Sequence, residues 1–275
     1  SSKTSLILNA EKKYALIMNY FLAFVSVFFI SSFLSPNIST ASRISSGSYH
    51  YNSKLKIPAK AWLIMDADTQ KIIASKSANK KLSPASTTKM MTAYVIGRMI
   101  QKNQISFNTK IRISKQAAKT EGSKMVLKAG SKVPVKYLLK GLLVNSGNDA
   151  AVALAQGSAG SIKNFVRIMN KTAESLGLKN THFMNPNGLP AKNHYSSAKD
   201  LAILANALIN NMPTIYKMCS SKTIRWNKRT RLNTNQLLWK KYLGVDGVKT
   251  GYTRNAKYCL VTSAYQNKKR IITVL

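Results

Sequence analysis

Acidic residues are scarce in this sequence. Its 275 residues include 8 Asp and Glu against 43 Lys and Arg, a formal net charge of +35, and no acidic patch opposes the basic residues that run from Lys3 to Arg270. Such a charge attracts polyanions in general and does not choose among nucleic acid, anionic lipid headgroups and acidic wall polymers. The fold motifs and the interleaved basic and aromatic faces of nucleic-acid-binding modules are missing, so we expect a generally basic surface and no nucleic-acid partner.

Histidine and cysteine are also few. His50, His182 and His194 show metal-ligand spacing neither with each other nor with Cys219 and Cys259. This pattern argues against a metal site, and we expect no metal and no other cofactor. In an oxidising compartment the two cysteines could form a disulfide, but two separate buried thiols agree with the sequence at least as well.

Charged residues are missing altogether from residues 14–34, which follow Lys3, Lys12 and Lys13. The 21 residues approach the roughly 20 that span a bilayer, whereas the densest apolar part, residues 21–34, is closer to the core of a signal peptide. Small residues before and at Ala41 suit cleavage there. We therefore expect a targeting segment over residues 1–41, removed rather than kept as an anchor, with a buried helix of the globular domain as the alternative. Positive charge before the segment predicts that the remainder is exported.

A Ser-rich linker over residues 42–58 separates this segment from a globular region over residues 59–275. Apolar runs at 61–65 and 71–74, with turn-forming residues between them, predict a β-hairpin. Residues 90–100 repeat apolar side chains near helical spacing, so Ser86, just after Pro84, lies at a helix entrance.

Further helices are expected at residues 135–144, 149–156, 162–176 and 197–211, and strands at 223–226, 247–250, 260–265 and 270–275. Strands at both ends with helices between them predict an α/β (α+β) fold: one antiparallel sheet built from N- and C-terminal strands, flanked by helices, with a helical subdomain. There is no internal repeat. The last residues are typical of the start of a strand, and the first is not Met, so we expect a fragment of a longer chain.

Four serines precede a lysine by three positions: Ser53, Ser77, Ser86 and Ser196. Only Ser86 begins a long apolar helix after a hairpin, where Lys89 lies one turn away on the same face. The start of a helix also directs unpaired N–H groups and the positive end of the helix dipole toward a developing oxyanion. Position therefore selects Ser86 as the candidate nucleophile.

A serine hydroxyl needs a base, and lysine can act as one only if burial or nearby cations lower its pKa. Lys249 precedes Thr250 and Gly251 on a predicted strand and would supply such a cation, while Gly251 would let a substrate approach the strand backbone. Ser146 and Asn148, on the turn between two helices, offer a hydroxyl and an amide. Each element has a plain alternative, namely an N-cap, an ordinary turn and a strand end.

Together these three elements resemble the motif set of the serine penicillin-binding proteins and β-lactamases, and most of all the low-molecular-mass D-alanyl-D-alanine carboxypeptidases. The similarity extends from Ala61 to Leu275. It lies in residues 84–91 (PASTTKMM), 146–150 (SGNDA), 177–183 (GLKNTHF) and 246–253 (DGVKTGYT).

The resemblance implies that Ser86 forms an acyl-enzyme, that Lys89 is the general base and that Ser146 relays a proton. It places the oxyanion hole at the backbone N–H groups of Ser86 and Tyr252. It further implies a β-lactamase/DD-peptidase-like fold in the bacterial periplasm or cell envelope, at the outer face of the cytoplasmic membrane. Because the base is a lysine, activity should be insensitive to changes of His50, His182 or His194.

The resemblance also implies the ligands. Asn148 would hold the substrate amide, and Lys249, Thr250 and Gly251, together with Tyr252, would bind a peptidoglycan stem peptide that ends in D-Ala-D-Ala. β-Lactams would be covalent inhibitors, and the basic surface suits association with an anionic membrane.

Two residues depart from the family pattern, Lys257 in place of a glycine and Lys199 in place of an arginine. Three other functions remain open: a β-lactamase, a DD-endopeptidase, and a non-catalytic envelope-binding protein of the same fold. A class A β-lactamase activates its deacylating water with a glutamate, and after Ser146 the only glutamate is Glu174, inside a predicted helix. We therefore expect β-lactams to acylate Ser86 and to leave slowly.

Overall fold

The computed structural model describes residues 57–240 and 244–275. The predicted targeting segment, His50 and all of the linker except Ile57 and Pro58 lie outside these residues. Within the described ranges, no helix combines the length and the hydropathy that crossing a bilayer requires.

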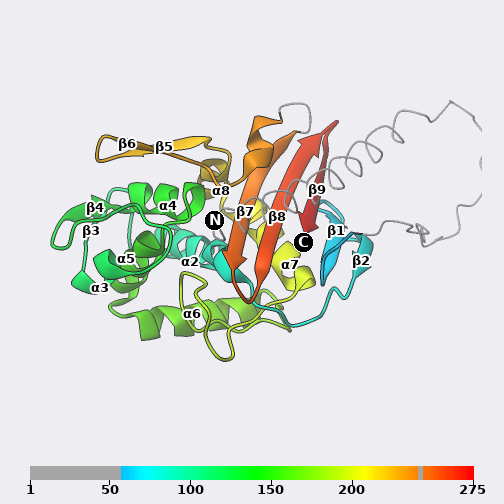
Figure 1. Cartoon of the computed structure of the whole chain (residues 1–275), viewed down its shortest axis with the longest axis horizontal. Coiled ribbons are helices and arrows are strands. Elements are labelled where there is room, and N and C mark those ends of the chain that lie inside the picture. The colour runs from blue at the N-terminus through cyan, green and yellow to red at the C-terminus, as the bar shows by residue number, and fades with distance from the viewer. Residues whose placement is uncertain (1–56, 241–243) are drawn as a thin grey trace, which may run out of the picture.

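A five-stranded antiparallel sheet forms one side of the molecule, in the order β2-β1-β9-β8-β7 (Figure 1). Its strands are β1 (Trp62–Asp66), β2 (Ile72–Lys76), β7 (Val245–Thr253), β8 (Lys257–Gln266) and β9 (Lys269–Val274). Leu63 of β1 lies opposite Val274 of β9, so the N-terminal hairpin is completed by the C-terminal strands. The predicted sheet is therefore confirmed.

The two faces of the sheet are both apolar, because successive side chains of a strand point to opposite faces. Leu63 and Met65 belong to the main core, whereas Trp62 and Ile64 belong to a smaller cluster with Leu237. Helix α7 (Ala198–Asn211) packs against β1, β8 and β9. The sheet thus has apolar contacts on both faces, and β7 lies at its edge, paired with β8.

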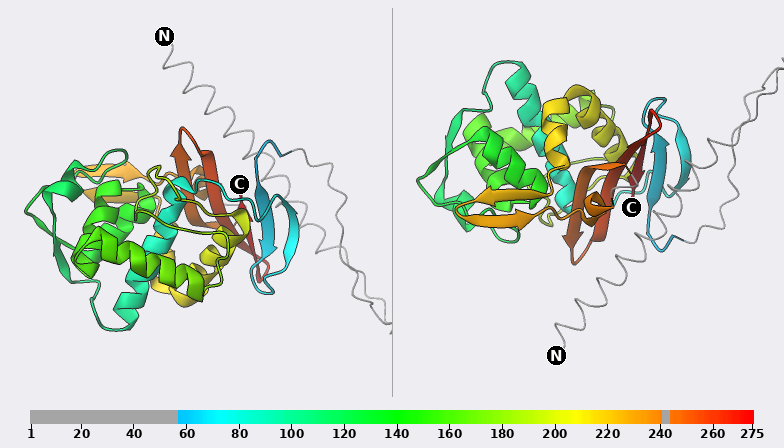
Figure 2. Two further views of the ribbon diagram at one scale, coloured as in Figure 1. Left: turned by 90° about the horizontal axis from the view of Figure 1, so that it is seen from below. Right: turned by 90° about the horizontal axis from the view of Figure 1, so that it is seen from above.

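The helical lobe lies beyond β7, as Figures 1 and 2 show from three directions. Its longer helices are α2 (Lys89–Gln101), α4 (Val135–Val144), α5 (Asn148–Ala159) and α6 (Ile162–Ser175). Helix α2 is buried along nearly all of its length and contacts α4, α5, α6, α7 and β7. The N-terminus of α2, with Lys89, therefore lies at the centre of the molecule, where the lobe meets the sheet.

The predicted helices and strands are confirmed, with ends that differ by zero to three residues. Several short elements were not predicted, because runs of this size show no clear periodicity. They are β3 (Lys110–Arg112), α3 (Lys115–Lys119), β4 (Lys132–Pro134), α8 (Pro213–Cys219), β6 (Arg229–Leu232), which pairs with the predicted β5 (Thr223–Trp226), and the 3₁₀ helix η2 (Gln236–Trp239).

Candidate active site

Ser86 lies in a 3₁₀ helix, η1 (Ala85–Thr88), that leads directly into α2. The residue before it, Ala85, has a left-handed φ of 49°, a conformation that non-glycine residues rarely adopt and that is often found at functional sites. No side chain caps α2, and the Ser86 hydroxyl bonds to Lys89 instead of a helix N–H group. The alternative that Ser86 is an ordinary N-cap is therefore wrong.

Lys89 is fully buried, and three oxygen atoms surround its amine. Nζ lies 3.0 Å from Ser86 Oγ, 2.7 Å from Asn148 Oδ1 and 2.7 Å from the main-chain oxygen of Asn187. A neutral amine has two N–H donors and one lone pair. The two amide oxygens can only accept, so they take both N–H groups, and the lone pair is left for the Ser86 hydroxyl.

The surroundings also keep this amine neutral. Burial lowers the pKa of Lys89 well below its ordinary value, and the nearby charge of Lys249 lowers it further, while Asp149 acts in the opposite direction. Because Asp149 accepts hydrogen bonds from the backbone N–H groups of Met125, Leu127 and Ala150, its charge is already satisfied locally. The lysine expected to act as a base thus has the environment that a base requires.

Ser146 lies on the tight turn between α4 and α5, Asn148 is the first residue of α5, and both side chains are buried. Ser146 has a φ of 58°, and its hydroxyl makes no hydrogen bond within the described part of the chain. Asn148 bonds on both sides of its amide, because Oδ1 accepts from Lys89 and one N–H of Nδ2 donates to the Glu121 carbonyl at 2.6 Å, which leaves the second N–H without a partner in the described residues. The start of α5, directly after this turn, therefore contributes to the surroundings of the amine, which residues after an ordinary turn would not do.

Lys249, Thr250 and Gly251 lie inside β7, not at a strand end. Lys249 is buried, its Nζ donates to the Thr250 carbonyl at 2.8 Å, and burial lowers its pKa to about 7. The Thr250 hydroxyl bonds to that of Thr234 at 2.6 Å. Tyr252 follows with its ring 53% exposed. This segment therefore carries a buried amine that is partly charged near neutral pH, a hydroxyl pair and a partly exposed ring on the strand that contacts η1.

Two glycines allow neighbouring segments to lie directly against the backbone of Ala85 and Ser86. A Cβ on Gly251 would lie 2.9 Å from Ser86 N, and a Cβ on Gly188 would overlap the Ala85 carbonyl. The Cβ position of Gly251 is thus occupied by the chain's own nucleophile segment. That this glycine also lets a substrate approach the strand backbone stays a prediction. Because Gly251 lies against Ser86, the backbone N–H groups of Ser86 and Tyr252 belong to two segments in direct contact.

The other Ser-x-x-Lys matches do not form such a pair. Ser196 Oγ lies 2.8 Å from the hydroxyl of Thr181, and Lys199 is exposed. Ser77 lies in an exposed turn with a φ of 51°. Ser53 lies outside the described residues.

Three residues that contribute to the site were not predicted from the sequence. The Asn187 carbonyl is a backbone atom, so the residue type carries no signal for it. Thr234, whose N–H donates to the Val144 carbonyl at 3.1 Å, lies 16 residues before Thr250 in a segment without periodic pattern. Asp149 could have been noticed, because it directly follows Asn148 at the start of a predicted apolar helix, where an acidic side chain is favourable.

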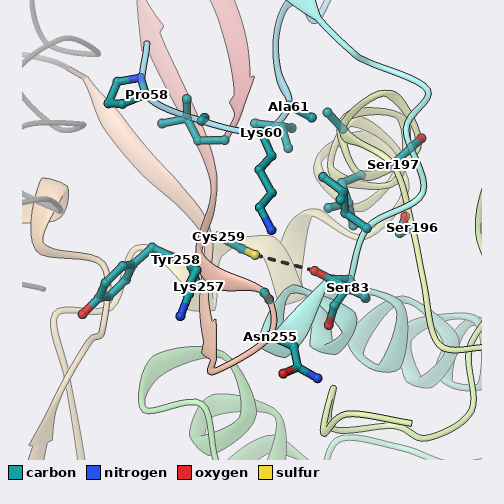
Figure 3. Close-up of a pocket in the computed structure, with 18 residues that line it drawn as sticks. Pro58, Lys60, Ala61, Ser83, Ser196, Ser197, Asn255, Lys257, Tyr258 and Cys259 are labelled. Carbon is teal, nitrogen blue, oxygen red and sulfur yellow. Dashed lines mark hydrogen bonds between the residues drawn. The ribbon is translucent and has the colours of Figure 1, made fainter. Parts of the chain in front are cut away.

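The two cysteines are separate thiols, which decides the open question of a disulfide. Burial raises the pKa of Cys219 to about 12 and that of Cys259 to about 11. Figure 3 shows Cys259 in a cavity of about 280 Å³, with Sγ 3.8 Å from the Ser83 carbonyl. No predicted site side chain lines this cavity, although Ser83 and Pro84 do.

Lys257, which stands where the family pattern has a glycine, adopts a left-handed φ of 61° at the start of β8. This conformation costs a non-glycine residue about 1–2 kcal/mol, while glycine loses about 0.5–1 kcal/mol more conformational entropy on folding. Lys257→Gly is therefore expected to raise the free energy of unfolding by about 0.5–1 kcal/mol, as measured by urea denaturation. Lys269→Gly, at the exposed start of β9, is the control and should lower it; equal losses for both variants would contradict the assigned strain.

Known proteins are similar to this chain over the segments that form the site. Residues 49–275 match the family Peptidase_S11, D-alanyl-D-alanine carboxypeptidase. The D-alanyl-D-alanine carboxypeptidase DacF of Bacillus subtilis (strain 168) is 43% identical over 231 residues, which are 81% of this chain and 58% of that protein.

Solved structures of such proteins share the fold. The D-alanyl-D-alanine carboxypeptidase DacD from Francisella tularensis superposes with a TM-score of 0.78 at 34% identity, over 86% of this chain and 68% of that one. Penicillin binding protein 5 from Haemophilus influenzae gives a TM-score of 0.77 at 38% identity, over 86% and 67%. The expected DD-peptidase-like fold is confirmed.

The chain spans 56–58% of the length of three curated D-alanyl-D-alanine carboxypeptidases that it matches. The family match, in contrast, includes every segment that forms the site, from the nucleophile to β7. On these grounds the chain belongs to the D-alanyl-D-alanine carboxypeptidase family, Peptidase_S11.

Proposed function

We propose that this protein is a serine D-alanyl-D-alanine carboxypeptidase that removes the terminal D-Ala from peptidoglycan stem pentapeptides, and that β-lactams acylate the same serine. One observation carries the proposal: a buried lysine with a lowered pKa lies 3.0 Å from the hydroxyl of the partly exposed Ser86. The names of its relatives, carboxypeptidases and a penicillin-binding protein, agree with this chemistry.

In the first step, neutral Lys89 takes the proton of the Ser86 hydroxyl, and Oγ bonds to the carbonyl carbon of the penultimate D-Ala. The backbone N–H groups of Ser86 and Tyr252 stabilise the oxyanion of the tetrahedral intermediate. The carbon–nitrogen bond then breaks, and its electron pair goes to the nitrogen of the departing D-Ala. That nitrogen receives the proton from Lys89 through Ser146, whose hydroxyl has no hydrogen-bond partner in the described ranges and is therefore available for the transfer.

Deacylation uses the same base. Lys89 takes a proton from water, the water oxygen bonds to the acyl carbon, and Ser86 recovers its proton as the ester breaks. Glu174, the alternative base of a β-lactamase, lies exposed on the last turn of α6. We therefore expect slow release of β-lactams.

The start of α5 and strand β7 orient the substrate. Lys249 and Thr250 bind the terminal carboxylate of the peptide, and a carboxylate beside Lys249 favours the charged form of this amine. Asn148 holds the substrate amide with the second N–H of Nδ2, because the first donates to the Glu121 carbonyl and Oδ1 accepts from Lys89.

We place the protein in the bacterial periplasm or cell envelope, at the outer face of the cytoplasmic membrane, with residues 1–41 as the targeting segment and 59–275 as the catalytic domain. Its acidic side chains leave the surface charge unbalanced, because Asp149 and Asp200 are buried and Asp246 forms an ion pair with Arg270. Association with an anionic membrane surface follows from this charge.

The proposal predicts that purified protein is labelled covalently by a fluorescent penicillin and that Ser86→Ala abolishes the label. The wild-type protein should also release free D-alanine from a synthetic pentapeptide, and Ser86→Ala should not. Ser196→Ala, which changes the serine of another Ser-x-x-Lys match, is the control and should label normally.

Other outcomes would identify the other functions. Rapid turnover of a chromogenic β-lactam would indicate a β-lactamase, and cleavage of crosslinked peptides without release of D-alanine a DD-endopeptidase. A well-folded protein without any label would indicate an envelope-binding protein, and would contradict the proposed acyl-enzyme.

A further inference from the structure

His194 is a buried histidine outside the residues that the reaction itself uses. It lies 2.9 Å from two partners on different segments: Nδ1 faces the backbone N of Met184, and Nε2 faces the hydroxyl of Thr88. The ring also packs edge-on against Phe183, at 5.8 Å between centroids. The imidazole therefore connects the loop after residue 183 to the start of α2.

The partners determine which nitrogen carries the proton. A backbone N–H can only donate, so Nδ1 must be the unprotonated acceptor, and Nε2–H donates to Thr88 Oγ1. Burial, with a smaller contribution from the charge of His182, lowers the pKa of His194 to about 4. The neutral ring that this arrangement needs is thus the form present at neutral pH.

Both ends of the bridge lie next to the contacts of Lys89. Thr88 directly precedes Lys89, and Met184 starts the loop whose Asn187 carbonyl accepts from the lysine amine at 2.7 Å. The same loop is bound to α2 once more, because Thr92 Oγ1 donates to the Pro186 carbonyl at 2.6 Å. A change in the distance between loop and helix would therefore move one of the two oxygens that orient the amine.

The internal shape of the loop does not depend on His194. Asn170 bonds to both backbone groups of Phe183, and Asn185 bonds to the N–H of Gly188 and to the carbonyl of Leu189. The imidazole adds a distinct link, from the loop to the turn of η1 that precedes Lys89.

We propose that His194 is a positioning residue for the general base: it holds the Asn187 carbonyl at the Lys89 amine, so that the lone pair of the amine faces Ser86. This inference rests on the proposed role of Lys89. It also revises the expectation that activity is insensitive to changes of all three histidines, and it keeps that expectation for His182.

The test breaks the bridge from each end. His194→Asn keeps an acceptor near Nδ1 for the Met184 N–H but cannot reach Thr88, and Thr88→Val keeps the ring and the side-chain shape but removes the acceptor. Each change is expected to lower the second-order rate of acylation by a fluorescent penicillin about 10-fold, because small displacements of catalytic groups have large effects on rate. The double variant should be no slower than the slower single variant, since both changes break one connection.

The matched control is His182→Asn, because His182 is a half-buried histidine whose Nδ1 lies 2.8 Å from the Asn193 carbonyl and which has no contact with Thr88, and this change should leave the rate unaltered. The final extent of labelling counts folded sites, whereas the rate reports on positioning, so the two effects separate. The long-range ¹⁵N–¹H correlation pattern of the wild-type His194 ring should show protonated Nε2.

Three outcomes would overturn the inference and leave the proposed acyl-enzyme unaffected. They are wild-type acylation rates in the folded fraction of both single variants, additive losses of rate in the double variant, and a proton on Nδ1 of His194. An unlabelled wild-type protein would overturn both proposals together.

Discussion

Replacing Lys89 with methionine is expected to lower the rate of acylation of Ser86 by β-lactams about 10³-fold, within the range that a general base contributes. Methionine keeps much of the length and the apolar stem of lysine but has no amine to take the hydroxyl proton. The buried site should tolerate this change, because removing the amine also removes a group that is costly to bury. The measurement is the second-order rate constant for a fluorescent penicillin, followed by the extent of labelling at long times.

The control for this variant is Lys199→Met, in the exposed lysine of the Ser196 match, which should acylate at the wild-type rate. In the wild-type protein the rate should also fall as the pH is lowered, because protonation of Lys89 removes its lone pair. The lowered pKa of Lys89 moves that fall to more acidic pH than an ordinary lysine would allow. A Lys89→Met variant that acylates as fast as the wild type would show that another group is the base.

Gly188→Ala is expected to reduce the free energy of unfolding by about 3 kcal/mol and to slow acylation severely. Gly188 has a φ of 87°, and an added Cβ would overlap the Ala85 carbonyl and approach Ser86 N at 3.0 Å. The strain of a left-handed alanine contributes about 1 kcal/mol, and forcing an extra methyl group into a packed site adds about 1–3 kcal/mol. Because the obstructing atoms are backbone, they can yield only by moving the nucleophile.

Gly177→Ala separates the two contributions. Gly177 has a similar φ of 72°, but nothing lies within 4 Å of an added Cβ. It should therefore lose only the conformational part, about 1 kcal/mol, and acylate normally. Urea denaturation and the acylation rate of both variants check this pair, and similar values for both would rule out the close contact between Gly188 and the nucleophile segment.

Much of the fold could be predicted because its main elements are long and strongly patterned. The predicted helix over residues 135–144 has the observed bounds, and the chain order of hairpin, helices and strands already implied a sheet shared by both ends. The short pairs β3–β4 and β5–β6 depend on tertiary contacts, so a periodic pattern could predict neither β3, β4 nor β6.

The site was predictable where side chains carry the chemistry. Ser86 and Lys89 are three residues apart on one helical face, so local geometry alone brings them together, and Lys249 stood out by its place on a strand. Contacts made by backbone atoms or by distant residues were not predictable. The Asn187 carbonyl, the Thr234 hydroxyl and the His194 ring reach the site only through loops whose course no local pattern encodes.

Local sequence properties, the three-residue spacing and the apolar helix that follows, were enough to select the serine and the lysine of the candidate pair. The neutral state of the lysine and the direction of its lone pair, in contrast, arise on folding. Both depend on burial and on oxygens from residues 59 and 98 positions away along the chain. The same packing decided that Gly251 and Gly188 make room for the backbone of the nucleophile segment, since that contact exists only once the loop and β7 close around it.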